Sequence, residues 1–474
     1  MKMVFTLAFP AIVESLLVSM VQYVDTAMVG SLGPDATAAV AASTPFMWML
    51  NSTIQAIAVG GTVTVAQAIG AKELDKARNV SGQAFIAVCA VSLTLMVFLL
   101  TCADLIPVFM GAEEQIHESA AAYIRITALG MPFFCSQMVF FGIIRGAGDT
   151  KTPMKLNVLI NITNVAGNFL LIFPKRTLTF GTVSIPMWGA GLGVEGAAWA
   201  TTFARVLAGV LLFGVMVRRR DVTLTLKGLK ADFPLLKEMM KIGIPTAMER
   251  LAISAGQTFF VRVVSSLGTI TLAAHQLALT AESISYMPAN GFQIAATTLV
   301  GNAVGAQKYD FARERATMTF RLGALCTLAM SLILFFGSRQ LIGFFTPSEA
   351  VVEQGSLALR IIAFGEIFYA MASIYTGALR GAGDTKQPFY VCVMTMWGVR
   401  IPMAYVFVKG FGLGIAGAWM AMGLDLIIRG SLMMYRFHHG RWEEKHRAKL
   451  EKETAQTELI HEKKGGVALT VIYC

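Results

Sequence analysis

Two acidic residues lie in the first long apolar segment of the chain, where a charge is costly. Glu14 and Asp25 are eleven residues apart. On an α-helix this spacing puts them about 20° apart around the axis and ~16 Å apart along it, so they share one face. An ionised side chain in a bilayer costs about 2.5–3.5 kcal/mol. We therefore expect this face, with Gln22 near it, to line a cavity in which a carboxylate can bind a proton, a metal cation or a cationic ligand.

Each acid has a second interpretation. Pro10 lies one turn before Glu14 and should bend the helix, so Glu14 could instead be a protonated carboxyl that bonds a carbonyl freed by the bend. Asp25 either exchanges a cation or is an interfacial carboxylate near the outer end of the helix.

The chain is a duplication. The heptapeptide RGAGDTK occurs at 145–151 and again at 380–386, a shift of 235 positions. The same shift relates Pro10 to Pro245, Glu14 to Glu249 and Gln22 to Gln257, whereas Phe260 stands at the position of Asp25. Near the end of each copy, GLGVEGAAWA at 191–200 matches GLGIAGAWMA at 412–421, a shift of 221. The first copy therefore carries 14 extra residues, most simply at 174–187.

The repeated heptapeptide reads as a connection between two helices. Gly146 and Gly148 can end the preceding helix in a left-handed conformation, and Asp149 can cap the next one. Pro153 suits the first turn of that helix, and Arg145 favours the negative C-terminal end of the preceding one. We interpret the heptapeptide as a hinge and topology element, not as a binding site.

Composition places both copies in a membrane. The chain is 55% hydrophobic and only 14% charged, and its apolar runs are long enough to cross a hydrocarbon core as helices. We predict twelve transmembrane helices, at 4–29, 37–69, 80–102, 119–144, 153–173, 188–217, 239–266, 271–304, 315–337, 351–379, 388–408 and 412–437. The fold is predicted to be all-α, with six-helix lobes at 1–230 and 231–437 related by a pseudo-two-fold axis along the membrane normal, followed by a cytoplasmic tail at 438–474.

Loop charges predict the orientation of the helices. Lysines and arginines concentrate in the loops after the even-numbered segments, whereas residues 103–118 contain four acids and no Lys or Arg. The positive-inside rule then places both termini in the cytoplasm and the protein, multi-pass, in the cell's inner (plasma) membrane. This bias and the tail account for the net charge of +10, so no nucleic-acid partner is expected.

Enzyme chemistry is not indicated. The chain contains no Gly-Lys dipeptide and hence no phosphate-binding P-loop, and neither of its two His-Glu pairs has the second histidine of a zinc protease. Its six cysteines are isolated. We expect no catalytic residues and no cofactor.

The sequence resembles the multidrug and toxic compound extrusion (MATE) family. The resemblance is carried by VDTAMVGSLGPDATAAVAAS at 24–43, by LAAHQLALTAESISYMPANGFQIAATTLVGNAVGA at 272–306, and by the paired RGAGDT loops. It implies two six-helix lobes around a central cavity. It also implies export of cationic or amphipathic small molecules against Na⁺ or H⁺, with no other cofactor.

The resemblance also implies a cation-coupling site in the first lobe. Asp25 matches the family's acid on the first helix, and Asn164, Asn168 and Thr201 match positions around it. Some relatives carry an aspartate at the position of Asn168, so this chain has one carboxylate fewer. Such oxygen ligands suit Na⁺, with Asp25 as its carboxylate ligand, but Asp25 could instead take a proton.

The second lobe matches less well. Relatives with a site there carry acids where this chain has Ile253 and Tyr369. Glu282 and Glu366 are the acids that could substitute, as counter-charges for drugs, and Arg400 could pair with one of them. Tyr286 could face a cationic drug. With these residues, the predicted substrate cavity comprises Glu14, Gln22, Glu249, Gln257, Glu282, Tyr286 and Glu366.

The sequence therefore predicts a secondary active multidrug efflux transporter that works by alternating access. We expect it to act as a monomer within the lipid bilayer. The alternative is a flippase or exporter of a lipid-linked or metabolite substrate with the same architecture. A lipid-diphosphate flippase would need a strongly cationic cavity, whereas the charges within these helices are mixed.

Overall fold

The computed structural model describes the chain except for residues 1, 181–182, 226–227, 229, 449 and 452–474. The elements of the first half are α1 (Lys2–Gly30), α2 (Pro34–Gly70), α3 (Leu74–Cys102), α4 (Leu105–Phe109), a 3-10 turn η1 (Glu114–Ile116), α5 (His117–Leu129), α6 (Met131–Gly146), α7 (Lys151–Leu171), β1 (Pro174–Phe180), β2 (Val183–Ala190) and α8 (Gly193–Arg218).

The second half repeats this order without the hairpin. Its elements are α9 (Phe233–Ser265), α10 (Thr269–Gly305), α11 (Tyr309–Phe336), α12 (Ser338–Gly343), α13 (Glu349–Ala363), α14 (Glu366–Gly381), α15 (Lys386–Thr395), the π-helical η2 (Met396–Arg400), α16 (Ile401–Tyr405), the π-helical η3 (Val406–Gly410) and α17 (Gly414–His439).

The long helices correspond to the predicted segments, with two kinds of difference. The fourth segment of each half is bent, by 51° between α5 and α6 and by 54° between α13 and α14. The bends fall at Gly130 and Gly365, which are equivalent positions, and Pro132 adds a missing N–H at the first. The prediction that a helix begins at 188 is wrong, because β1 and β2 form an antiparallel hairpin over the extra residues and α8 begins at Gly193.

Not every long helix is equally apolar. Within the described part of the chain, seven helices are long and apolar enough to cross a bilayer, or nine if each bent pair is one span. The remaining long helices are α7, α9 and α10, which carry more polar side chains. Polar side chains inside such helices point to function or to internal pairing.

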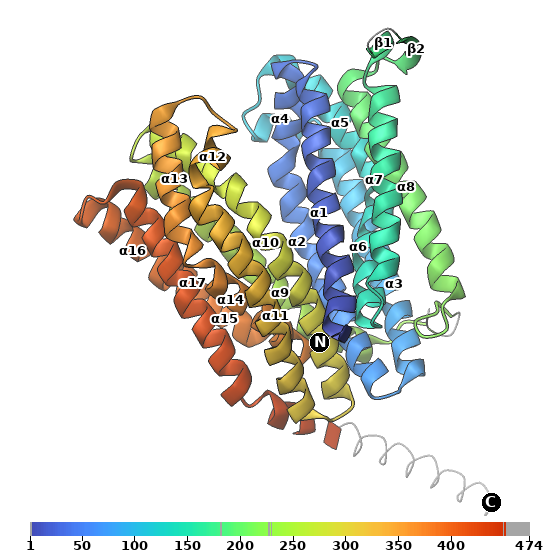
Figure 1. Ribbon diagram of the computed structural model, residues 1–474. Helices are drawn as coiled ribbons and strands as arrows, with labels where there is room; N and C mark the ends of the chain where they lie inside the picture. Colours follow the sequence, from blue (N-terminus) through green and yellow to red (C-terminus); the bar gives the residue numbers. More distant parts are fainter. Residues whose placement is uncertain (1, 181–182, 226–227, 229, 449, 452–474) are drawn as a thin grey trace, which may run out of the picture.

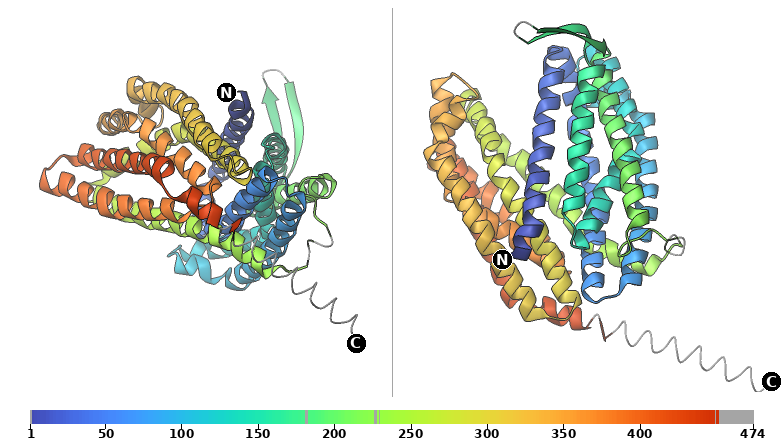
Figure 2. Two further views of the ribbon diagram at one scale, coloured as in Figure 1. Left: turned by 90° about the horizontal axis from the view of Figure 1, so that it is seen from below. Right: turned by 45° about the vertical axis from the view of Figure 1, so that its right-hand side comes forward.

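The two halves form two bundles arranged as a V (Figure 1). The bundles converge at the end that carries the N-terminus and the chain after α17, and we call this end the apex. They diverge toward the end that carries the β1–β2 hairpin, which the second view in Figure 2 shows from the side.

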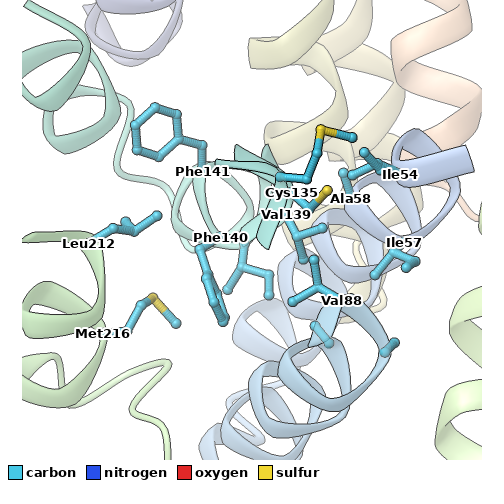
Figure 3. Close-up of a cluster of buried hydrophobic side chains, with 14 of the residues drawn as sticks. Ile54, Ile57, Ala58, Val88, Cys135, Val139, Phe140, Phe141, Leu212 and Met216 are labelled. Carbon is cyan, nitrogen blue, oxygen red and sulfur yellow. The ribbon is translucent and has the colours of Figure 1, made fainter. Parts of the chain in front are cut away.

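Each half has its own hydrophobic core. In the first half, side chains from α2, α3, α6 and α8 meet around Val88, Val139 and Phe140 (Figure 3). The second half has two main clusters. One of them also includes Val4, Leu7 and Ala8 of α1, so the start of the first helix packs into the other half.

The halves meet at the apex through exchanged helices. α1 packs on α10, α9 packs on α2, and α2 and α10 contact each other. Glycines allow this approach: a Cβ added to Gly70 would lie 2.0 Å from the carbonyl oxygen of Asn302, and one added to Gly305 would lie 1.9 Å from that of Gln67. Gly70 and Gly305 are equivalent positions, so the seam is symmetric.

The RGAGDTK loops connect α6 to α7 and α14 to α15 at the apex. Gly148 has a φ of 90° and its equivalent Gly383 a φ of 84°, which confirms the predicted left-handed residue there. Gly146 instead remains helical, and a Cβ there would lie 2.4 Å from the carbonyl oxygen of Thr62. Asp149 accepts the backbone N–H groups of Lys151 and Thr152 at 2.9 and 3.0 Å, as expected for a cap.

Asp149 also receives hydrogen bonds from side chains. The Thr152 hydroxyl and the Arg219 guanidinium each donate to it at 2.6 Å. Burial opposes ionisation, but these hydrogen bonds outweigh it, so the pKa of Asp149 lies below its ordinary value. A lowered folded-state pKa stabilises the fold at neutral pH, and this contribution is lost as the pH falls through that pKa.

The glycine seam gives a first prediction. Gly70→Ala and Gly305→Ala should each lower stability by about 1–3 kcal/mol, because the added methyl group overlaps a carbonyl of the other half. Gly214→Ala, in the interior of α8 with open space around it, is the matched control and should not destabilise. Thermal unfolding of the purified protein in detergent measures the effect. Equal melting temperatures for the three variants would contradict the close approach.

Candidate functional site

The four residues assigned to the cation site come together between α1, α7 and α8. Asn168 Nδ2 donates to Asp25 Oδ1 at 2.5 Å. In the amide orientation that satisfies both of its neighbours, Asn164 donates to the same oxygen at 2.7 Å and accepts from the Thr201 hydroxyl at 3.2 Å. Asn164 and Asn168 are one turn apart, so α7 presents both amides to α1.

This cluster is partly open. Asn164 and Asn168 are buried, whereas Asp25 and Thr201 are half-buried. Among the described atoms, Asn168 Oδ1 is buried without a hydrogen-bond partner. A buried acceptor is costly without a donor or a cation, so beside Asp25 this oxygen fits a further ligand.

Arg205 is a basic neighbour that the sequence analysis missed. It lies on α8 one turn after Thr201 and is half-buried. Its guanidinium lies 4.6 Å from the ring centroid of Phe134 and interacts electrostatically with Asp25. Within the described chain it makes no ion pair. The spacing of four residues from Thr201 was the signal that could have placed it on the site's face of α8.

The four equivalent positions of the second half are apolar. Phe260 replaces Asp25 and is fully buried. By the shifts of 235 and 221, the positions of Asn164, Asn168 and Thr201 are taken by Val399, Met403 and Met422. Phe260 and Met422 belong to one buried cluster, with Met403 packed against it. The duplication has therefore kept the helices but not this polar site.

Polar residues of the second half gather instead around Glu282 on α10 and Glu366 at the start of α14. Both carboxyl groups are fully buried, and none of their four described oxygens has a hydrogen bond of ordinary geometry, although Tyr286 interacts with Glu282 and Ser285 with Glu366. The two acids interact electrostatically. The Tyr286 ring stacks on Tyr369, with centroids 4.1 Å apart. In this conformation the acids do not reach solvent as counter-charges would.

Arg400 pairs with neither of these glutamates, so the predicted pairing is wrong. Its Nε donates to Asp425 at 2.7 Å, and Arg429 donates to the same carboxylate at 2.8 Å. Arg400 Nη1 also reaches the side-chain oxygen of Gln257 at 3.4 Å. Asp425 and Arg429 are charges four residues apart inside an apolar helix, and that spacing could have identified them.

Glu14 and Glu249 each form a buried ion pair. Arg145 Nη2 donates to Glu14 at 2.6 Å, and its equivalent Arg380 donates to Glu249 at 2.9 Å. Asn157 adds a donor to Glu14 at 2.7 Å. The partner of Glu14 is therefore a guanidinium, not a carbonyl freed at Pro10.

These ion pairs also change the interpretation of the heptapeptide. Its arginine does not stay at the helix end but turns inward to α1 or α9. Gln22, by contrast, is exposed on α1 and belongs to neither ion pair.

Known proteins agree with this architecture. The model of the MatE family matches residues 10–170 and again residues 245–406, the two repeats. The chain belongs to the MatE family. Its members are transporters, so this chain is a multi-pass membrane transporter and not an enzyme, and the family predicted from the sequence is confirmed.

One relative is a probable multidrug resistance protein, NorM, of Thermotoga maritima. It is 32% identical over 444 residues, covering 94% of this chain and 93% of the relative. An uncharacterized transporter of Bacillus subtilis, YisQ, is 28% identical and covers 93% and 95%.

Solved structures show the same fold. A multidrug resistance MATE transporter in an outward-facing conformation aligns with a TM-score of 0.84 at 21% identity, covering 95% of this chain and 96% of that one. A transporter from Pyrococcus furiosus, described as having a binding pocket of reversed polarity, gives the same TM-score and identity over 92% and 95%. The predicted all-α fold of twelve helices in two lobes is confirmed.

The buried ion pairs give a second prediction. Arg380→Ala leaves Glu249 buried without its partner and should lower stability by about 3–5 kcal/mol. Arg339→Ala removes an exposed partner of Glu349, with side chains 58% and 69% exposed, and should cost less than about 1 kcal/mol. Thermal unfolding in detergent compares the two variants. Equal losses of stability would mean that the buried ion pair contributes no more to the fold than the exposed one.

Proposed function

We propose that this transporter is a secondary active multidrug efflux protein that exports cationic or amphipathic compounds in exchange for Na⁺ or H⁺. The observation that carries the proposal is the cluster of Asp25, Asn164, Asn168 and Thr201. It combines a carboxylate accessible from one side, two amides and a hydroxyl on helices of one lobe, and a buried oxygen that lacks a donor. Such a group can exchange a small cation for a ligand.

The set of ligands suits either coupling ion. Na⁺ takes carboxylate, amide and hydroxyl oxygens, and Asp25, Asn168 and Thr201 offer one of each. Arg205 lies close by and already supplies a positive charge, which disfavours a second cation. A proton on Asp25 needs fewer ligands. Both exchanges would link ion binding to drug binding at one carboxylate.

A pair of buried acids in the second half, Glu282 and Glu366, supports proton exchange. Two interacting carboxylates that are buried with so few donors would be very costly in ionised form, so Glu282 and Glu366 are best accommodated with bound protons in this conformation. They would ionise when the lobe rearranges and water or a cationic drug reaches them. We assign these acids to the substrate path on this ground, with Tyr286 beside them.

The shape of the molecule supports alternating access. The two bundles are joined at the apex and diverge toward the other end (Figure 1). The loop after α2 and the first turns of α3, α7 and α15 at the apex carry Lys72, Lys76, Arg78, Lys151 and Lys386, so the positive-inside rule makes the apex cytoplasmic. The protein would then be open to the outside in this conformation. The name of the Thermotoga maritima relative supports drugs as substrates, and we propose that one chain suffices for transport.

A third prediction tests the orientation. A cysteine at Glu113, in the acidic loop opposite the apex, should react with an impermeant maleimide added to intact cells. A cysteine at Asp75, whose side chain is 94% exposed at the apex, should react only in inside-out vesicles. Both are placed in a background that lacks the native cysteines. The reverse pattern would invert the proposed direction of transport.

A fourth prediction tests coupling at Asp25. Asp25→Asn keeps the shape of the side chain but removes its exchangeable charge. We expect the variant to fold and to bind drug, but to lose drug efflux driven by a Na⁺ gradient or by a proton gradient. Inside-out vesicles given each gradient alone also identify the coupling ion in the parent. Asp35→Asn, at an exposed position on α2, is the matched control.

Drug affinity provides a second measurement of coupling. In the parent, affinity should fall as the coupling ion is raised, and in Asp25→Asn this dependence should disappear. A variant that pumps normally and keeps the parent's full dependence on pH and Na⁺ would show that Asp25 is not the coupling residue.

A further inference from the structure

The chain does not leave the fold after α17. Gly440 is extended, and a Cβ there would lie 2.2 Å from the carbonyl oxygen of Arg436, so the chain turns closely on the helix end. Residues 442–448 are helical and lie against the apex. The sequence predicted a cytoplasmic tail at 438–474, of which residues 449 and 452–474 lie outside the described residues.

Aromatic packing anchors this segment to the second half. Trp442 is 1% exposed, and its indole N–H donates to the carbonyl oxygen of Phe437 at 2.6 Å. Its ring stacks on Phe437 with centroids 5.3 Å apart and meets the edge of Tyr309 at 6.0 Å. His446 Nδ1 lies 3.1 Å from the Tyr309 hydroxyl.

Ion pairs hold the same segment to one helix and one loop of the second half. Arg313, near the start of α11, donates to Glu443 at 2.9 Å. Lys445 Nζ lies 3.2 Å from Asp384, the aspartate of the second RGAGDTK repeat. Asp384 is buried while Lys445 is 55% exposed, so the lysine covers a carboxylate that would otherwise have one side open.

The other side of the segment faces the first half across a small cavity. His446 and Leu450 line this cavity together with Gly305 of α10 and Glu238 of α9. The rest of the wall belongs to α2, the loop after it and the start of α3: Thr64, Gln67, Ala68, Ala71, Glu73 and Lys76. Gln67 and Gly305 are the residues whose backbones touch across the seam, so the segment lies directly over the junction of the halves.

The first half has matching anchors but a different continuation. Arg219, after α8, pairs with Asp149, and Arg78 donates to the carbonyl oxygen of Arg220 at 2.8 and 3.0 Å. Asp149 and Arg78 are equivalent to Asp384 and Arg313. Residues 219–220 lead into α9, whereas residues 441–448 extend over the seam. Only the second set of anchors therefore carries a segment that lines a cavity between the halves.

We propose that residues 441–448 form a strap that holds the apex closed. It is fixed to the second half by Trp442, Glu443 and Lys445, and through His446 it lines the cavity that α2 of the first half also lines. The proposal rests on the proposed alternating access, in which the halves separate at the apex. During that step the anchors can stay, but the cavity between the segment and α2 must open. The strap therefore favours the conformation closed at the apex.

The test measures opening of the apex directly. Thr64, 2% exposed beside the seam, is replaced by cysteine in a background without native cysteines. The rate of its reaction with an impermeant maleimide, in purified protein in lipid nanodiscs, reports apex opening. Lys445→Ala combined with His446→Ala should raise this rate roughly five- to thirtyfold, the factor expected when one or two contacts of this kind are lost. Deletion of residues 441–474 should raise it at least as much.

Two controls make the result specific. Arg441→Ala, at an exposed position whose side chain is 81% accessible, should leave the rate unchanged. A cysteine at Glu113, at the opposite end, should react equally fast with and without the strap. An unchanged rate at Thr64→Cys in the double variant, or an equal rise at both reporters, would overturn the proposal. Because no drug or ion gradient is used, failure here is distinct from failure of coupling at Asp25.

Discussion

Two buried ion pairs, Glu14–Arg145 and Glu249–Arg380, connect the exchanged helices to their own halves. α1 packs its first residues into the core of the second half, and α9 packs against α2 of the first. α1 also packs on α7 and α9 on α15, so each exchanged helix has further contacts with its own half. A buried ion pair contributes little net stability over an apolar contact, but losing one partner is costly. The pairs therefore add a specific link between each exchanged helix and its own half, and they give the arginine of both heptapeptides the same structural role.

The seam at the apex follows from the same exchange. Glycines bring the backbones of α2 and α10 together where no side chain fits. The halves can therefore be in full contact at the seam or separated there, with few intermediate arrangements. Close-packed interfaces of this kind switch between arrangements and do not deform gradually. The first half has its own core (Figure 3), and the second half has two further clusters, which suits bundles that move as bodies. The proposed strap would cover the seam only when the apex is closed.

The duplication gave both halves the same arrangement of helices, and later substitutions gave them different polar residues. The first half keeps Asp25 among amides, with Arg205 close by, whereas Phe260, Val399, Met403 and Met422 occupy the same places in the second. The second half carries its own acids, Glu282 and Glu366, on other faces of its helices. With the proposed ion site in one lobe and buried acids in the other, the two lobes would respond to different ligands. The features that remain the same in both halves are the glycine contacts of the seam and the two RGAGDTK loops.

The sequence alone determined the membrane class, the duplication, the twelve segments and the grouping of Asp25 with Asn164, Asn168 and Thr201. These follow from local composition, from identical spacing in the two copies and from family resemblance. The tertiary structure decided which charges are partners. Glu14 meets an arginine 131 positions away, Arg400 meets Asp425 and not a glutamate, and Arg205 lies near Asp25. Helical spacing shows which residues share a face, but not which face of another helix lies opposite. The helix exchange and the return of residues 441–448 to the seam set those pairings through contacts between distant parts of the chain.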